Sequence, residues 1–159
     1  MLKFHPILWP PFSLRGEKVR NRRKKCMKIL IAEDDFVSRK LVNTLLSPLG
    51  EVDIAANGNE AIMAVKMALK NNQPYDLICL DILMPEVDGI MALKKIRQLE
   101  AQKGLNPEKR SKIIMTTAVS DKNYVIAAVQ ADCDGYLLKP IKKDRLFDEI
   151  RKLGFDIPQ

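Results

Sequence analysis

The chain has 159 residues, of which 47% are hydrophobic and 30% charged, with a formal net charge of +7. These values favour a single soluble globular domain, and no apolar run approaches the roughly 20 residues that a membrane-spanning helix needs. The three cysteines, Cys26, Cys79 and Cys133, form no CxxC pair. A disulfide framework is therefore not expected. We expect instead a location in the reducing cytoplasm.

The positive charge is concentrated at the N-terminus. Residues 1–26 hold eight basic side chains and one acid, which leaves 19 of the 27 basic and 19 of the 20 acidic side chains for the rest. The remainder has no overall basic field of the kind that attracts nucleic acid. The apolar residues 7–12 are interrupted by prolines and precede the basic run at 20–25, which is the reverse of a secretory signal.

Three interpretations of residues 1–26 remain open. Translation begins at Met27 and the segment is absent from the native protein, or the segment is a disordered tail without a specific partner. In the third, its basic run anchors nucleic acid or anionic lipid. A domain at 27–155 and a short tail at 156–159 are expected to follow.

The first predicted strand covers residues 28–32 and is followed by three acids. A helix is indicated next by Val37, Leu41 and Leu45 on one face, with Val42 and Leu46 beside it. This helix should end near residues 48–50, before a second strand at 52–55. The Asn57-Gly58 turn then opens a second helix, which ends by residues 71–74.

The apolar run at 77–80 is too short for a helix and suits a strand buried on both faces. A loop at 85–89 leads to a third helix, and further strands are predicted at 112–117 and 135–138. Asp121 is placed to cap the helix between those strands, which carries Val125, Ala128 and Val129, and Leu146, Ile150 and Leu153 mark the last helix. Five strands alternating with five helices predict an α/β fold with a single five-stranded parallel sheet covered on both faces.

Functional side chains stand at the carboxyl ends of four predicted strands. They are Glu33, Asp34 and Asp35 after the first strand, Asp81 after the third, Thr117 at the end of the fourth and Lys139 after the fifth. Sites in parallel α/β sheets lie at this edge, so these side chains should converge. On its own, Asp81 also fits a helix cap or turn residue.

The chemistry of the set indicates phosphoryl transfer. Clustered carboxylates repel one another and need a cation, and oxygen ligands suit Mg²⁺. A lysine and a hydroxyl beside such a metal can bind an anion. The set is therefore consistent with an aspartate that accepts a phosphoryl group.

Residues 27–155 resemble the receiver domain of response regulators in two-component signalling. The matching segments are residues 29–35, 80–85, 88–89, 117–118 and 134–140. The resemblance implies a doubly wound (βα)5, flavodoxin-like receiver fold. It also implies a single-domain response regulator similar to chemotaxis regulators.

The resemblance implies a role for each matching acid. Asp81 would be the phosphoacceptor, and Mg²⁺ would be held by Asp34, Asp81, the backbone carbonyl of Leu83 and, through a water, Glu33. Asp35 would cap the first helix. In the alternative assignment, the acidic pair is Asp34 and Asp35, and each metal-binding role moves one residue along the chain.

Other positions match the family's phosphate contacts and switch. Lys139 and Thr117 would contact the phosphate, Thr117 and Tyr136 would form the switch, and a cis peptide would precede Pro140. Strand alternation should turn the neighbouring Thr116 to the opposite face. Without the surrounding motif, Tyr136 also fits an ordinary half-buried strand aromatic.

Leu83 and Val119 match positions that flank the path of the hydrolytic water. Both are apolar here, which implies slow self-dephosphorylation.

The implied function is signalling rather than enzymatic turnover. A sensor histidine kinase or histidine phosphotransfer protein would supply the phosphoryl group. The fourth helix, fifth strand and fifth helix would then contact a downstream protein effector. No small-molecule substrate beyond phosphodonors is implied, and nucleic acid could bind only through the N-terminal tail.

Two other functions start from similar features. A haloacid-dehalogenase-type phosphatase also uses a strand-end aspartate and Mg²⁺, but it carries Asp-x-Asp after its first strand, whereas Asp81 follows the third strand here and precedes Ile82 and Leu83. A flavodoxin-like cofactor binder needs a glycine- or hydroxyl-rich phosphate loop where this chain has acids.

Overall fold

The computed structural model describes residues 26–159, so the predicted segment 1–26 lies outside the described residues except for Cys26. The strands are β1 (Met27–Ala32), β2 (Gly50–Ala55), β3 (Leu77–Asp81), β4 (Lys112–Thr117) and β5 (Gly135–Leu138). The helices are α1 (Phe36–Leu46), the 3-10 turn η1 (Ser47–Leu49), α2 (Gly58–Lys70), α3 (Gly89–Gln102), α4 (Lys122–Gln130) and α5 (Lys143–Lys152). None of the helices in this part of the chain has the length and apolar character that crossing a membrane requires.

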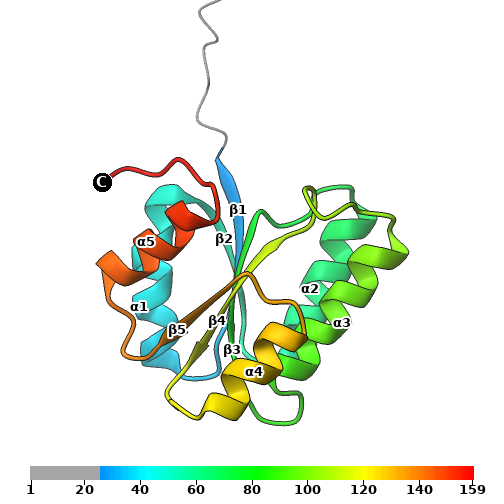
Figure 1. Cartoon of the computed structure of the whole chain (residues 1–159). Helices are drawn as coiled ribbons and strands as arrows, with labels where there is room; N and C mark the ends of the chain where they lie inside the picture. Colours follow the sequence, from blue (N-terminus) through cyan, green and yellow to red (C-terminus); the bar gives the residue numbers. More distant parts are fainter. Residues whose placement is uncertain (1–25) are drawn as a thin grey trace, which may run out of the picture.

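All strands pair in parallel, in the order β2-β1-β3-β4-β5, which confirms the predicted single sheet. Helices α1 and α5 cover one face, and α2, α3 and α4 cover the other (Figure 1). Each face has its own apolar cluster. Val42, Leu46 and Ile150 belong to the α1/α5 cluster, whereas Val65 and Ile96 belong to the α2–α4 cluster.

Strand β3 lies at the centre of the sheet, between β1 and β4. All five of its residues are buried, because helices pack against both of its faces. Its last residue, Asp81, is in register with Thr116 of β4. The uninterrupted apolar run before Asp81 therefore delivers one carboxylate to the middle of the carboxyl edge.

The loop after β3 is held tightly against the end of that strand. Gly89 N donates to Ile82 O at 2.8 Å, and a Cβ atom at position 89 would lie 2.1 Å from the backbone oxygen of Asp81. Only glycine allows this approach without displacing the backbone. The close contact fixes the start of α3 beside the Asp81 carbonyl.

The predicted apolar faces of two helices differ from the structure. In α1, Val42 and Leu46 are buried and Leu45 is half-buried, whereas Val37 is 72% and Leu41 43% exposed. In α4, Ala128 is buried but Val129 is 64% exposed. Apolar residues in these helices occupy more than one stripe, and contact with the sheet selects only one of them.

Candidate functional site

Three acids converge at the carboxyl edge of the sheet. Glu33 and Asp34 follow β1, Asp81 ends β3, and each offers one carboxylate oxygen such that the three atoms lie within 4.8 Å of one another. Glu33 and Asp81 are buried, and Asp34 is exposed. The topology brings these residues together because β1 and β3 are neighbours.

Lys139 lies between two of the acids. Its Nζ is 2.5 Å from Glu33 Oε2 and 3.2 Å from Asp81 Oδ2. Its backbone N donates to Thr117 O at 2.8 Å, and its peptide bond to Pro140 is cis. The ammonium group thus enters the acidic cluster from the end of β5.

The second carboxylate oxygen of Asp81, Oδ1, is buried and has no hydrogen-bond partner within residues 26–159. Burial and the negative charge of Glu33 raise the pKa of Asp81 to about 7, although Lys139 acts in the opposite direction. Burial lowers the pKa of Lys139, but its hydrogen bond to Glu33 and the charge of Asp81 outweigh that effect and leave this pKa above its usual value. The site therefore holds more negative charge than one lysine neutralises.

These residues fit a hard divalent cation. The donor set contains only carboxylate oxygens, and one donor residue, Asp34, faces solvent. Mg²⁺ prefers oxygen ligands and retains several waters, which an exposed side of the site permits. Leu83, whose carbonyl is the other predicted ligand, lies in the β3–α3 loop two residues beyond Asp81.

A short chain of contacts leads from β4 to β5. Val119 N donates to Thr117 Oγ1 at 3.2 Å, and the Tyr136 hydroxyl lies 3.5 Å from Val119 O as a long hydrogen bond. Thr117 is fully buried and Tyr136 is half-buried. The backbone of Val119 therefore links Thr117 and Tyr136, the two side chains that the resemblance implies as a switch.

The other residues singled out from the sequence lie near the ends of β1, β3 and β4. Asp35 caps α1 by accepting from Ser38 N at 2.7 Å, as expected, and this hydrogen bond lowers the pKa of Asp35. Thr116 shares the sheet face of Ile114 and lies opposite Thr117, because side chains alternate along β4. Leu83 is exposed and Val119 half-exposed.

Sequence reasoning missed Arg39, whose side chain reaches the same loop. Its Nη1 donates to the carbonyl of Glu33 at 2.8 Å and to that of Asp34 at 3.2 Å. The available signal was an arginine in the helix that directly follows the run of acids.

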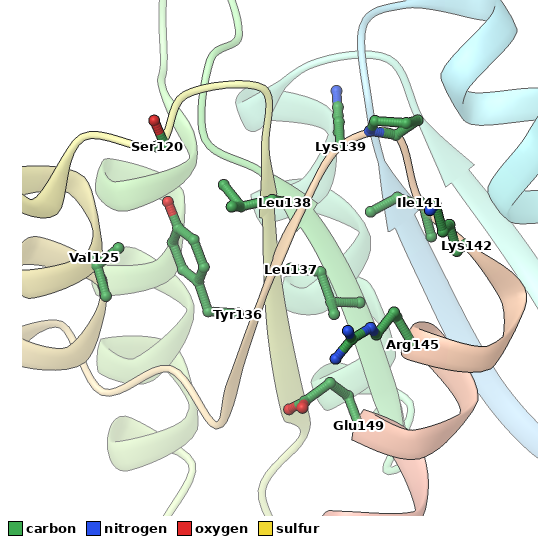
Figure 2. A pocket seen from close by; sticks show the side chains of 11 residues that line it. Ser120, Val125, Tyr136, Leu137, Leu138, Lys139, Ile141, Lys142, Arg145 and Glu149 are labelled. Carbon is green, nitrogen blue, oxygen red and sulfur yellow. The ribbon is translucent and has the colours of Figure 1, made fainter.

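A groove of 530 Å³ lies on the surface formed by α4, β5 and α5. Figure 2 shows Tyr136 beside Val125 of α4 with its hydroxyl directed toward Ser120. Arg145 and Glu149 of α5 border the other side of the groove. Leu138 of β5, which is 51% exposed, adds an apolar surface.

The chain is similar in sequence and in fold to known proteins. A sequence model described as the response regulator receiver domain matches residues 29–151. The chain is 35% identical over 125 residues to the chemotaxis protein CheY of Bacillus subtilis, which covers 79% of this chain and 95% of that protein. It is 29% identical over 128 residues to the osmosensing histidine protein kinase SLN1 of Saccharomyces cerevisiae, covering 79% of this chain but only 10% of the kinase.

A solved structure gives the same relationship in three dimensions. The receiver domain of the histidine kinase CKI1 from Arabidopsis thaliana, complexed with Mg²⁺ and BeF₃⁻, superposes with a TM-score of 0.70 at 28% identity. The match covers 80% of this chain and 89% of that domain. Together with the convergent acids, the family match and the CheY relative show that this chain belongs to the response regulator receiver domain family of two-component phosphorelay signalling.

Proposed function

We propose that this receiver accepts a phosphoryl group on Asp81 from a phosphohistidine, in a Mg²⁺-dependent reaction, and signals through its α4-β5-α5 face. The observation that carries the proposal is the state of the Asp81 carboxylate. Oδ2 is paired with Lys139, while Oδ1 is buried without a partner in the described part of the chain. A buried carboxylate oxygen without a partner is costly to folding, and a reactive role accounts for it.

The transfer step needs few groups. Asp81 Oδ1 attacks the phosphorus in line, the P–O bond forms, the P–N bond breaks, and its electron pair returns to the imidazole of the donor. Lys139, which already contacts Oδ2 at 3.2 Å, would balance the charge that develops on the phosphoryl oxygens. Mg²⁺ bound by Asp34 and Asp81, the Leu83 carbonyl and, through water, Glu33 would supply further charge neutralisation.

The switch follows from the Thr117 hydroxyl. A phosphoryl group on Asp81 would draw this hydroxyl toward it and away from Val119 N, its present partner at 3.2 Å. The Val119 backbone would then release the long contact from the Tyr136 hydroxyl. Tyr136 could turn inward, which would change the groove that it lines.

Two kinds of partner protein are proposed, one that donates the phosphoryl group and one that responds to it. A sensor histidine kinase or histidine phosphotransfer protein would donate the phosphoryl group, and the relatives include histidine kinases such as SLN1. A downstream protein would bind the α4-β5-α5 groove. Cysteine usage supports a cytoplasmic setting, and nucleic acid contact is proposed only for the basic run at 20–25, outside the described residues.

Phosphorylation by a small phosphodonor tests the proposal directly. The parent, incubated with acetyl phosphate and Mg²⁺, should gain one phosphoryl group by intact-mass spectrometry, and base or hydroxylamine should remove it, as expected of an acyl phosphate. Asp81→Asn should gain none, and chelation of the metal should prevent the reaction in the parent. Asp88→Asn is the matched control, because asparagine keeps the helix cap that Asp88 provides to α3. Equal labelling of the parent and Asp81→Asn would contradict the assignment.

Beryllofluoride, which mimics an acyl phosphate, tests the switch separately. Its addition with Mg²⁺ should shift the NMR signals of Thr117, Tyr136 and Lys139 in the parent but not in Asp81→Asn. Shifts confined to the β3–α3 loop would argue against transmission to the groove.

A further inference from the structure

Arg39 contacts the backbone of the acidic loop rather than a carboxylate. Its Nη1 donates to Glu33 O at 2.8 Å and to Asp34 O at 3.2 Å. The guanidinium carbon lies 5.7 Å from the centre of the Phe36 ring, one turn earlier in α1. The ring contact and the two carbonyl contacts together restrict where the guanidinium can go.

The position of Arg39 is not explained by helix stability. Asp35 caps α1, so Arg39 lies near the N-terminal end of this helix, where the dipole disfavours a positive charge. No ion pair joins Arg39 to a carboxylate within residues 26–159. Its described polar contacts are the two loop carbonyls.

Fixing those carbonyls also fixes the carboxylates that the same residues carry. The Glu33 amide donates to Ala55 O at 3.1 Å and its Oε1 accepts from Asp35 N at 3.1 Å. Arg39 adds a further constraint, because it holds the carbonyl oxygens of the two peptide groups that flank the Asp34 Cα. The Asp34 side chain is exposed, so the direction in which it points depends on this backbone.

We propose that Arg39 is a positioning residue for the metal site, which pre-orients Glu33 and Asp34 toward Asp81 for Mg²⁺ binding. The inference rests on the proposed function, since it assumes that the cluster binds Mg²⁺. Arg39 would thus contribute to the affinity of the site for Mg²⁺ without being a ligand of the metal.

Two effects of Arg39 on Mg²⁺ oppose each other. Its positive charge repels the cation, so removal of the charge alone would strengthen binding. Its hydrogen bonds hold the ligands in place, so loss of those bonds would weaken binding. The sign of the change in dissociation constant therefore distinguishes positioning from simple electrostatics.

The experiment titrates the full chain with Mg²⁺ and follows the amide NMR signals of Glu33, Asp34 and Asp81. Arg39→Met should raise the dissociation constant by about tenfold, the lower end for loss of a group that supports a metal ligand. Arg39→Lys keeps the charge but lacks the planar guanidinium, and it should also weaken binding. Lys40→Met is the matched control, because it removes the same charge from the adjacent exposed position of α1.

Each result has one meaning. Unchanged or tighter binding by Arg39→Met would overturn the inference while leaving the proposed function intact. Equal weakening by Arg39→Met and Lys40→Met would also overturn it. Absence of Mg²⁺ binding at this site in the parent would overturn both proposals. Melting curves recorded without Mg²⁺ should remain nearly unchanged for Arg39→Met, and a large loss of stability that accounts for the weaker binding would refute a positioning role.

Discussion

The ammonium group of Lys139 lies closer to Glu33 than to Asp81, at 2.5 Å from Glu33 Oε2 against 3.2 Å from Asp81 Oδ2. Lys139, the only cationic side chain within this cluster in residues 26–159, thus forms ion pairs with two buried carboxylates. Burial and the charge of Glu33 raise the pKa of Asp81, and the contact with Lys139 offsets this effect only in part. The shared lysine also makes the protonation of Asp81 depend on Glu33.

Glu33→Gln should lower the pKa of Asp81 below its value of about 7 in the metal-free protein. The substitution removes a negative charge that favours the protonated acid, and it frees Lys139 to pair with Asp81. Carboxyl ¹³C NMR titration measures the pKa directly. Asp34→Asn is the comparison and should change it less, because Asp34 is exposed and its charge is screened by solvent. A pKa of Asp81 that stays near 7 in Glu33→Gln would count against this coupling.

Asp81→Asn should stabilise the metal-free protein at neutral pH. A carboxyl whose pKa is raised on folding binds its proton more tightly in the folded state, so stability falls as pH rises from about 4 toward 7. Asparagine does not titrate. We therefore expect the free energy of unfolding of Asp81→Asn to exceed that of the parent by about 2 kcal/mol above pH 7 and to be almost equal to it near pH 4. Urea unfolding of both proteins at several pH values checks this. A gain that is constant across pH would show that ionisation of Asp81 is not its cause.

Gly89→Ala should destabilise the fold and weaken the site together. The added Cβ would lie 2.1 Å from Asp81 O, so the start of α3 or the end of β3 must move, at a cost of about 2 kcal/mol or more. Gly135→Ala provides the contrast, since its Cβ would first meet side-chain atoms at 3.3 Å or beyond. Thermal melts and Mg²⁺ titration of both variants make the comparison. Similar losses in the two variants would mean that the contact with Asp81 is not special.

Polar residues at the positions of Leu83 and Val119 should accelerate loss of the phosphoryl group. Both side chains are apolar and neither can orient an attacking water by hydrogen bonding. We expect Leu83→Asn together with Val119→Gln to raise the dephosphorylation rate by roughly tenfold or more. The decay of the base-labile phosphoprotein, followed by intact mass after removal of the donor, measures this rate. A half-life of seconds in the parent would contradict the prediction of slow self-dephosphorylation.

Much of the fold could be predicted because the sequence carries local signals for it. The short apolar run at 77–80 predicted a buried strand, and the position of Asp121 before an apolar period predicted a helix cap. The Asp35 cap was implied by the resemblance to receiver domains. The convergence of Glu33, Asp34 and Asp81 followed from parallel strands sharing an edge.

The wrong predictions of buried helix faces, and the contacts of Lys139, depend on tertiary packing. Val37 and Leu41 have the right period for a buried face, but the face of α1 that contacts the sheet carries Val42 and Leu46 instead. The contacts of Lys139 with two acids require the packed positions of β1, β3 and β5. The Arg39 contacts are local, because they join α1 to the loop just before it. No spacing in the sequence determines which acid a lysine approaches more closely.

The sheet also separates the energetics of the two halves of the core. Because the α1/α5 and α2–α4 clusters lie on opposite faces, a cavity made at Leu46 cannot be filled by side chains around Ile96. Losses of stability from Leu46→Ala and Ile96→Ala should therefore be additive within about 0.5 kcal/mol. Two cavities on the same face share neighbours, so their losses of stability should not be additive. The protein can thus change the packing of one layer with little thermodynamic consequence for the other.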